Sequence, residues 1–251
     1  MLLREEGGDV LCIGQASHAW ISGQLARAWG NDLFPVPSPR EEVCLAAVQH
    51  DIGMAGWDLR PSLNPATGWP HSFLEMPLAV HLELWTAAPS KILTQSRYAA
   101  LLVSMHGVAL YERRDLDSLP PHQRELVISY LSGQRELQDR LAAQLDADRQ
   151  ELARNQRLLW TWDGLSLALC LRWDPFRLER VPGKRGPIDL DLRAVEPTSF
   201  ELDPWPFSRD VVELVCEGRR LEGRFDDEEK LHSALERAES RRLHFTLAKR
   251  L

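Results

Sequence analysis

Val48-Gln49-His50-Asp51-Ile52-Gly53-Met54 places an imidazole next to a carboxylate at the end of the apolar run 43–48. The run predicts a buried helix that ends near Asp51. Burying a charged aspartate costs free energy unless the carboxylate is paired or bound to a cation. The pair is therefore either a hydrogen-bonded couple that only stabilises the fold or part of a metal site. The dipeptide alone favours the first interpretation, and the rest of the chain favours the second.

The composition is that of a chain long enough for one sizeable core. It has 251 residues, 44% of them hydrophobic, and a net charge of −7. No block of Lys and Arg forms a basic face, which disfavours a nucleic acid polymer as partner. No apolar stretch approaches the roughly 20 residues that span a bilayer, and the acidic, glycine-rich segment 1–8 is unlike a signal peptide. We therefore expect a cytoplasmic protein with no membrane partner.

The four cysteines are far apart and form no CxxC pair, so neither a zinc finger nor a disulfide framework is expected. Apolar residues at helical spacing dominate the first two thirds of the chain. They predict helices at about 18–29, 40–51, 77–88, 90–110, 120–148 and from 147 to the end of this region. A short strand is expected at 9–13.

The character of the sequence changes after Trp173-Asp174-Pro175. Alternating segments such as Ile188-Asp189-Leu190-Asp191-Leu192 predict strands, and one amphipathic helix is expected at 227–240. The sequence thus predicts a mainly α protein, α+β overall. Residues 1–174 would form a helical metal-binding bundle and residues 175–251 a small β-rich lobe, either as two domains or as one continuous domain. The strand at 9–13 would join the strands of this lobe.

Segment 53–77 is rich in glycine and proline and follows the His-Asp pair directly. A loop of this length with several aromatic residues is typical of a functional segment. His71 and Asp58 are therefore candidate catalytic residues, as general acid or substrate contact, although a loop histidine is more often simply solvated. An apolar pocket lined by Trp57, Trp69 and Trp85 would suit an organic ligand.

Six histidines and aspartates occupy apolar helical settings, and together they are the candidate metal ligands. They are His18, His50, Asp51, His81, His106 and Asp163. Imidazole and carboxylate are ligands of borderline divalent ions, and a site without thiolates that leaves a position for water is catalytic rather than structural. For Asp163, a structural hydrogen bond in the core is an equally weighted alternative.

The order His18 … His50-Asp51 … Asp163 resembles the H…HD…D signature of the HD-domain metal-dependent phosphohydrolases, and Asp163-Gly164-Leu165-Ser166 resembles the D-x-L-S around their last ligand. Further stretches are similar to an uncharacterised group within that superfamily, DUF3891. These stretches are Gln15-Ala16-Ser17-His18-Ala19-Trp20, Gln49-His50-Asp51-Ile52-Gly53, His81 and Asp203-Pro204-Trp205-Pro206-Phe207.

The resemblance implies an HD-like helical bundle in which His18, His50, Asp51 and Asp163 hold a first metal. Asp51 would bridge to a second ion held by His81 and His106, and a bound hydroxide would attack a phosphorus centre. Where many such hydrolases carry a lysine after the HD motif, this chain has Met54. The missing positive charge could come from Lys91, Arg60 or Arg97.

Three functions follow from these observations. The first is hydrolysis of a phosphorylated small molecule with one or two divalent ions (Fe, Mn, Co, Zn or Mg), in which Asp51 is also catalytic. The second is a di-iron oxygenase on the same ligands. The third is a non-catalytic protein whose metal or His/Asp cluster only joins helices. The sequence indicates no oligomeric state.

Overall fold

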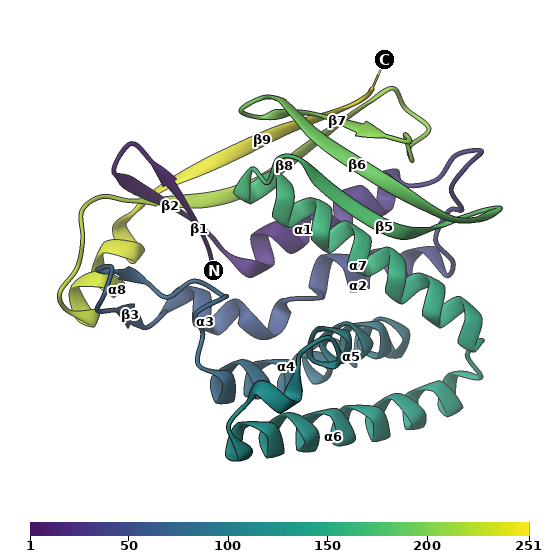
Figure 1. The fold of residues 1–251 in the computed structure, drawn as a ribbon, viewed down its shortest axis with the longest axis horizontal. Coiled ribbons are helices and arrows are strands. Elements are labelled where there is room, and N and C mark those ends of the chain that lie inside the picture. The colour runs from purple at the N-terminus through teal and green to yellow at the C-terminus, as the bar shows by residue number, and fades with distance from the viewer. Residues whose placement is uncertain (251) are drawn as a thin grey trace.

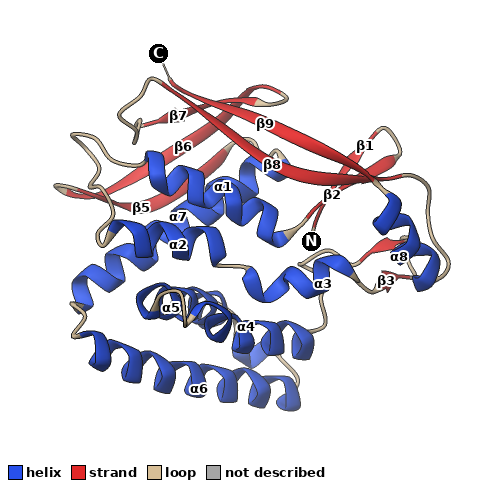
Figure 2. Ribbon diagram, turned by 180° about the vertical axis from the view of Figure 1, so that it is seen from behind, coloured by secondary structure: helices blue, strands red, loops and turns tan. Residues whose placement is uncertain are grey.

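A curved seven-stranded sheet covers one side of a layer of helices in this protein. The computed structural model describes residues 1–250. Figure 1 shows the sheet above the helices, with helix α6 (Pro121–Leu145) farthest from it. Figure 2 shows the same separation of strands and helices from behind. The architecture is therefore α+β, with helices on one face of a large sheet.

The sheet combines strands from both ends of the chain, in the order β1-β2-β8-β9-β7-β6-β5. Its strands are β1 (Leu2–Glu6), β2 (Asp9–Ile13), β5 (Phe176–Gly183), β6 (Gly186–Glu196), β7 (Ser199–Asp203), β8 (Val211–Leu221) and β9 (Glu239–Lys249). Neighbours are antiparallel except β7 and β9, which run parallel with Ser199 opposite Thr246. In β8, Val212, Leu214 and Cys216 are buried at every second position, as expected where one face of the sheet is covered.

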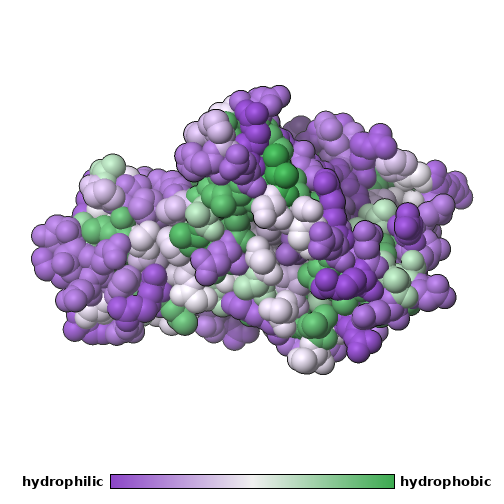
Figure 3. All heavy atoms as spheres, turned by 90° about the horizontal axis from the view of Figure 1, so that it is seen from below, coloured by the Kyte–Doolittle hydropathy of each residue, from purple (hydrophilic) through white to green (hydrophobic). Residues whose placement is uncertain are grey.

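The helices form two tiers beneath the sheet. The remaining ones are α1 (Gln15–Ala28), α2 (Arg40–Gln49), α3 (Ala55–Leu59), α4 (Leu78–Ile92), α5 (Arg97–Glu112), α7 (Arg149–Leu171) and α8 (Glu228–Arg237), with 3-10 turns at Ile52–Met54 and Leu116–Ser118. Helices α1 and α7 contact the sheet, and α2, α4 and α5 lie between them and α6. The underside of the molecule is mostly hydrophilic, with separate apolar patches (Figure 3).

An aromatic cluster around Trp29 joins the helices to the sheet. The Trp29 ring lies 5.8 Å from that of Trp162 in α7 and 5.6 Å from that of Phe207, which follows β7. Both contacts are edge-to-face, the arrangement that aromatic quadrupoles favour. One continuous hydrophobic core includes these side chains together with Leu214 and Phe245 of the sheet.

The prediction of a mainly α, HD-like bundle with a small β-rich C-terminal lobe is wrong. The sheet has seven strands, and β1 and β2 belong to it, because β2 pairs with β8 through Val10 opposite Leu221. The sequence places the strand at 9–13 with the C-terminal strands, but period-two patterns carry no information on which strands pair or on how many belong to one sheet. The boundary between residues 1–174 and 175–251 stays a prediction.

The segment 53–77, expected as a loop, contains the short helix α3 and a two-stranded ribbon of β3 (Leu63–Asn64) and β4 (Trp69–Pro70). None of the helices formed by residues 1–250 combines the length and the hydrophobicity needed to cross a bilayer.

Candidate metal centre

Close packing of α1 on α2 brings His18 to the end of α2. A Cβ at Gly23 of α1 would lie 2.1 Å from the Val48 side chain, so only glycine permits this approach. The start of α1 is fixed by Asp58, whose carboxylate accepts the backbone N–H of Gln15. His18 lies one turn further along, fully buried, and faces the residues that end α2.

His50 and Asp51 lie where α2 ends and the chain turns. His50 Nδ1 is 2.9 Å from the carbonyl oxygen of Ala47 and donates to it, which leaves Nε2 directed away from its own helix. Asp51 has already left helical geometry, with φ −102° and ψ 16°. Two adjacent residues can therefore direct their side chains at one point, which an uninterrupted helix would not allow.

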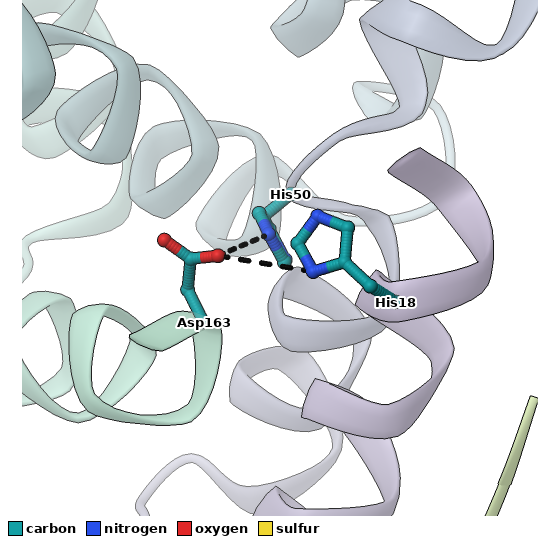
Figure 4. Close-up of side chains that lie close together, drawn as sticks. All are labelled: His18, His50 and Asp163. Carbon is teal, nitrogen blue, oxygen red and sulfur yellow. Dashed lines mark ion pairs between the residues drawn. The ribbon is translucent and has the colours of Figure 1, made fainter. Parts of the chain in front are cut away.

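Asp163 reaches the same point from the middle of α7. Its Oδ1 lies 3.4 Å from His50 Nε2 and 3.9 Å from His18 Nδ1. Figure 4 shows its carboxylate facing both imidazoles from across the cluster. Asp51 Oδ2 lies 2.6 Å from His18 Nε2 and 3.6 Å from His50 Nε2. Two carboxylates and two imidazoles thus converge in a site that is almost entirely shielded from solvent.

The donor set fits a divalent cation. His50 Nε2 is buried and has no hydrogen-bond partner within residues 1–250, although it faces Asp51 and Asp163 at 3.6 and 3.4 Å. Bonds of about 2.1 Å to a common ion separate neighbouring ligand atoms by about 3.0 to 3.4 Å. His18, His50 and Asp163 each offer a ligand atom within 4.8 Å of the others, so this group could hold a metal ion.

The pKa shifts of His50, Asp51 and Asp163 show that the two buried carboxylates stabilise a positive charge beside them. Burial lowers the pKa of His50, but the charges of Asp51 and Asp163 outweigh burial and raise it to about 9. Burial acts to raise the pKa of both aspartates, yet the surrounding imidazoles outweigh it and lower them. Both acids are therefore ionised at neutral pH, and a proton on His50 supplies compensation that a cation would also supply.

His106 joins the cluster, whereas His81 is occupied by other partners. His106 Nε2 lies 3.5 Å from Asp163 Oδ2, and burial lowers the pKa of this imidazole to about 4. The Nε2 of His81 accepts the Trp85 indole N–H at 3.0 Å, and its Nδ1 lies 2.5 Å from the Tyr111 hydroxyl. Both nitrogens of His81 are thus engaged by neutral partners, and within residues 1–250, unlike His18, His81 forms no ion pair with a carboxylate.

The cluster opens into a cavity of about 160 Å³. Its walls come from α1, α4, α5, α7 and the segment before α4, and consist of Gln15, His18, Asp51, Phe73, Leu74, His81, Trp85, His106, Leu110, Arg114, Asp163 and Leu167. Of the three tryptophans expected to line a pocket, Trp85 belongs to this lining. Within residues 1–250, Trp57 and Trp69 do not contribute to it. His106, Leu110 and Arg114 recur at i, i+4 and i+8 on one face of α5 and its end.

The structure does not bring Asp58 and His71 to the cavity, as judged over residues 1–250. Asp58 is buried against the start of α1, and its second oxygen lies 2.7 Å from the Met1 amine. His71 Nδ1 lies 2.9 Å from Ser62 Oγ in the β3–β4 ribbon region. Asp58 thus anchors a helix, and the catalytic roles given to Asp51, Asp58 and His71 stay predictions.

Arg114 is the cation that the sequence reasoning missed. It lines the cavity, whereas Lys91, Arg60 and Arg97 do not belong to the lining formed by the described residues. Its guanidinium carbon lies 4.8 Å from the centre of the Tyr111 ring. The spacing of Arg114 from His106, eight residues or about two helical turns, was the signal that could have found it.

Comparison with known proteins assigns this chain to a protein family. Residues 1–223 match the family described as protein of unknown function, DUF3891. Neither the search of curated proteins nor that of solved structures found a match. Because the matched segment covers most of its 251 residues, this chain belongs to the DUF3891 family.

Proposed function

We propose that this protein is a hydrolase of small phosphoesters that depends on one bound divalent cation. The observation that carries the proposal is the buried nitrogen of His50, which lacks a partner among residues 1–250 and faces two carboxylates at the spacing of metal ligands. His18, His50 and Asp163 would hold the ion, with Asp51 beside them. The mixture of imidazole and carboxylate suits Mn²⁺, Fe²⁺, Co²⁺ or Zn²⁺ better than Mg²⁺.

Such an ion polarises a phosphoryl oxygen and lowers the pKa of a coordinated water. The chain itself orients the ligands: Ser166 Oγ lies 2.9 Å from His18 Nδ1, and the Ala47 carbonyl fixes the ring of His50. The side chains of Trp85, Leu110 and Leu167 give the cavity an apolar wall. A substrate that fills the space beside this wall would displace water, which strengthens the electrostatic interactions there.

The H…HD…D order of the ligands supports hydrolysis, because it resembles the HD-domain phosphohydrolases. One ion is proposed rather than two, since both nitrogens of His81 are engaged by Trp85 and Tyr111. The same observation weakens the di-iron oxygenase, which would need a complete second ligand set. A non-catalytic metal protein is the alternative that experiment has to separate from the hydrolase.

The first test is elemental analysis of protein purified without chelators. We expect about one equivalent of Mn, Fe, Co or Zn in the wild type and in the control His71→Ala, and almost none in Asp163→Asn. The metal-loaded protein is then assayed on a panel of small phosphoesters. Hydrolysis of the phosphomonoesters is followed by release of phosphate, and hydrolysis of the phosphodiesters by release of the alcohol.

The outcomes separate the functions. Hydrolysis that requires the metal supports the hydrolase. A stoichiometric metal without hydrolysis of any member of the panel overturns the hydrolase in favour of the non-catalytic metal protein. A wild type that binds no divalent ion even after reconstitution overturns the hydrolase and leaves the His/Asp cluster as a structural one.

A further inference from the structure

We infer that Arg114 and Gln15 select the substrate of this cavity. The substrate would be a compound of few heavy atoms that presents an anionic group to Arg114 and a hydrogen-bond donor, such as a hydroxyl, to Gln15. The inference rests on the proposed function, because it assigns the ligand of the same site. It adds which residues recognise that ligand, apart from the metal, and how large it can be.

Arg114 is available for an anion. Its side chain is exposed at the rim of the cavity, and no carboxylate of residues 1–250 forms an ion pair with it. The contact with the Tyr111 ring holds the guanidinium against the wall at 4.8 Å. A guanidinium binds phosphate or carboxylate oxygens through two parallel N–H donors. Arg114 therefore supplies the positive charge that Met54 does not.

The charges of the site favour one anion. Asp51 and Asp163 carry two negative charges, which the divalent cation of the proposed function would neutralise. The positive charge of Arg114 then remains uncompensated next to the cavity.

Gln15 offers an unused acceptor. It is 4% exposed and lines the cavity, yet its Oε1 makes no hydrogen bond within the described chain. A buried polar atom without a partner carries a desolvation cost, which a ligand that donates to it would remove. The backbone of Gln15 is held by Asp58, so the side chain starts from a fixed position. Gln15 thus distinguishes ligands with a donor from those without.

The size of the cavity limits the ligand. Its volume of about 160 Å³ equals that of roughly five water molecules in the liquid and lies below the range of about 300 to 1,000 Å³ for drug-sized ligands. Phe73 and Leu74 line one side. Their segment is tied down, because the Phe73 N–H donates to the Met1 carbonyl and Glu75 accepts from Ser72. We therefore expect a ligand of this size rather than a nucleotide.

Calorimetric titration of the metal-loaded and metal-free protein tests the inference without relying on turnover. The probes are methyl phosphate, glycerol 3-phosphate, which adds hydroxyl donors, and AMP, which adds bulk. We expect the wild type to bind glycerol 3-phosphate more tightly than methyl phosphate, and AMP not measurably. Arg114→Gln should weaken both small esters by about tenfold to a hundredfold, since it removes charge-assisted hydrogen bonds.

Gln15→Leu and Gln15→Met should each lower the affinity for glycerol 3-phosphate to that for methyl phosphate, while methyl phosphate binds as before. The matched control is Arg113→Gln, which removes the neighbouring charge. Arg113 lies over Trp160, 3.9 Å from the ring centre, and outside the cavity lining found among residues 1–250. Thermal denaturation verifies that each variant is folded.

The result that overturns the inference is an Arg114→Gln protein that binds both esters like the wild type, a wild type that binds neither, or AMP binding as tight as that of glycerol 3-phosphate. Binding that depends on Arg114 without any hydrolysis would sink the proposed function and leave the inference standing. Hydrolysis that is unchanged by substitution of Arg114 and Gln15 would support the proposed function and overturn the inference.

Discussion

His50 and His81 are both removed from bulk solvent near the same cavity, and they differ in what surrounds their nitrogens. His81 is hydrogen-bonded at both nitrogens, and burial together with the charge of Arg114 lowers its pKa to about 4. His50 has one nitrogen without a partner within residues 1–250, and two carboxylates overcome the effect of burial and raise its pKa to about 9. The two histidines therefore differ in the charge around them: His81 has neutral hydrogen-bond partners, whereas His50 faces two carboxylates.

The largest effect that separates the two histidines is expected in metal content. His50→Ala removes a ligand, so the bound metal should fall from about one equivalent to less than about a tenth. His81→Ala should retain the metal, because neither of its nitrogens faces the cluster. Elemental analysis after gel filtration measures both. Loss of metal in both variants would erase the distinction and restore His81 as a ligand.

Removal of the metal should change stability through the same cluster. An ion present at about a hundred times its dissociation constant stabilises the folded state by about 2.7 kcal/mol. For a chain of this size the melting temperature should therefore drop by roughly 5 to 10 °C when a chelator is added. Differential scanning calorimetry should show this drop in the wild type and in His81→Ala, and none in His50→Ala. An identical drop in all three would point to a second site.

A smaller effect is expected from the residue that orients His18. Ser166→Ala removes the hydroxyl 2.9 Å from His18 Nδ1, and loss of such an orienting contact typically weakens metal binding by about tenfold to a hundredfold. Tyr111→Phe, which removes the partner of His81 instead, serves as control and should leave affinity unchanged. Competition with a chelating dye measures both. Equal affinities for Ser166→Ala and the wild type would contradict the assignment.

The smallest effect is expected on the stability of the fold, when the hydrogen bonds of His81 are removed. His81→Leu leaves the Trp85 indole N–H and the Tyr111 hydroxyl without their partner, which should lower the free energy of unfolding by about 2 kcal/mol. The half-buried position of His81 lets water replace part of what is lost. Urea denaturation of the chelator-treated proteins measures this free energy without the contribution of the metal. An unchanged midpoint would show that the two hydrogen bonds contribute nothing.

The site was more predictable from sequence than the fold was. The H…HD…D order and apolar surroundings singled out His18, His50, Asp51 and Asp163, and the structure brings these four together with His106. The reason is chemical: a charged or polar residue inside an apolar helix has to find a partner, whatever the fold. His81 was a candidate by its apolar helical setting as well as by the resemblance, and its hydrogen bonds to Trp85 and Tyr111 became visible only in three dimensions.

By itself the sequence determined where the longer helices form and which polar residues of the cluster would be buried, because both follow from local periodicity. Only the tertiary structure decided that β2 pairs with β8 across about 200 residues and that Arg114 faces the cavity. Strand pairing depends on long-range register, and the approach of α1 to α2 depends on the absence of a single Cβ at Gly23. Neither is encoded in the pattern of one segment, since each requires two distant segments to meet.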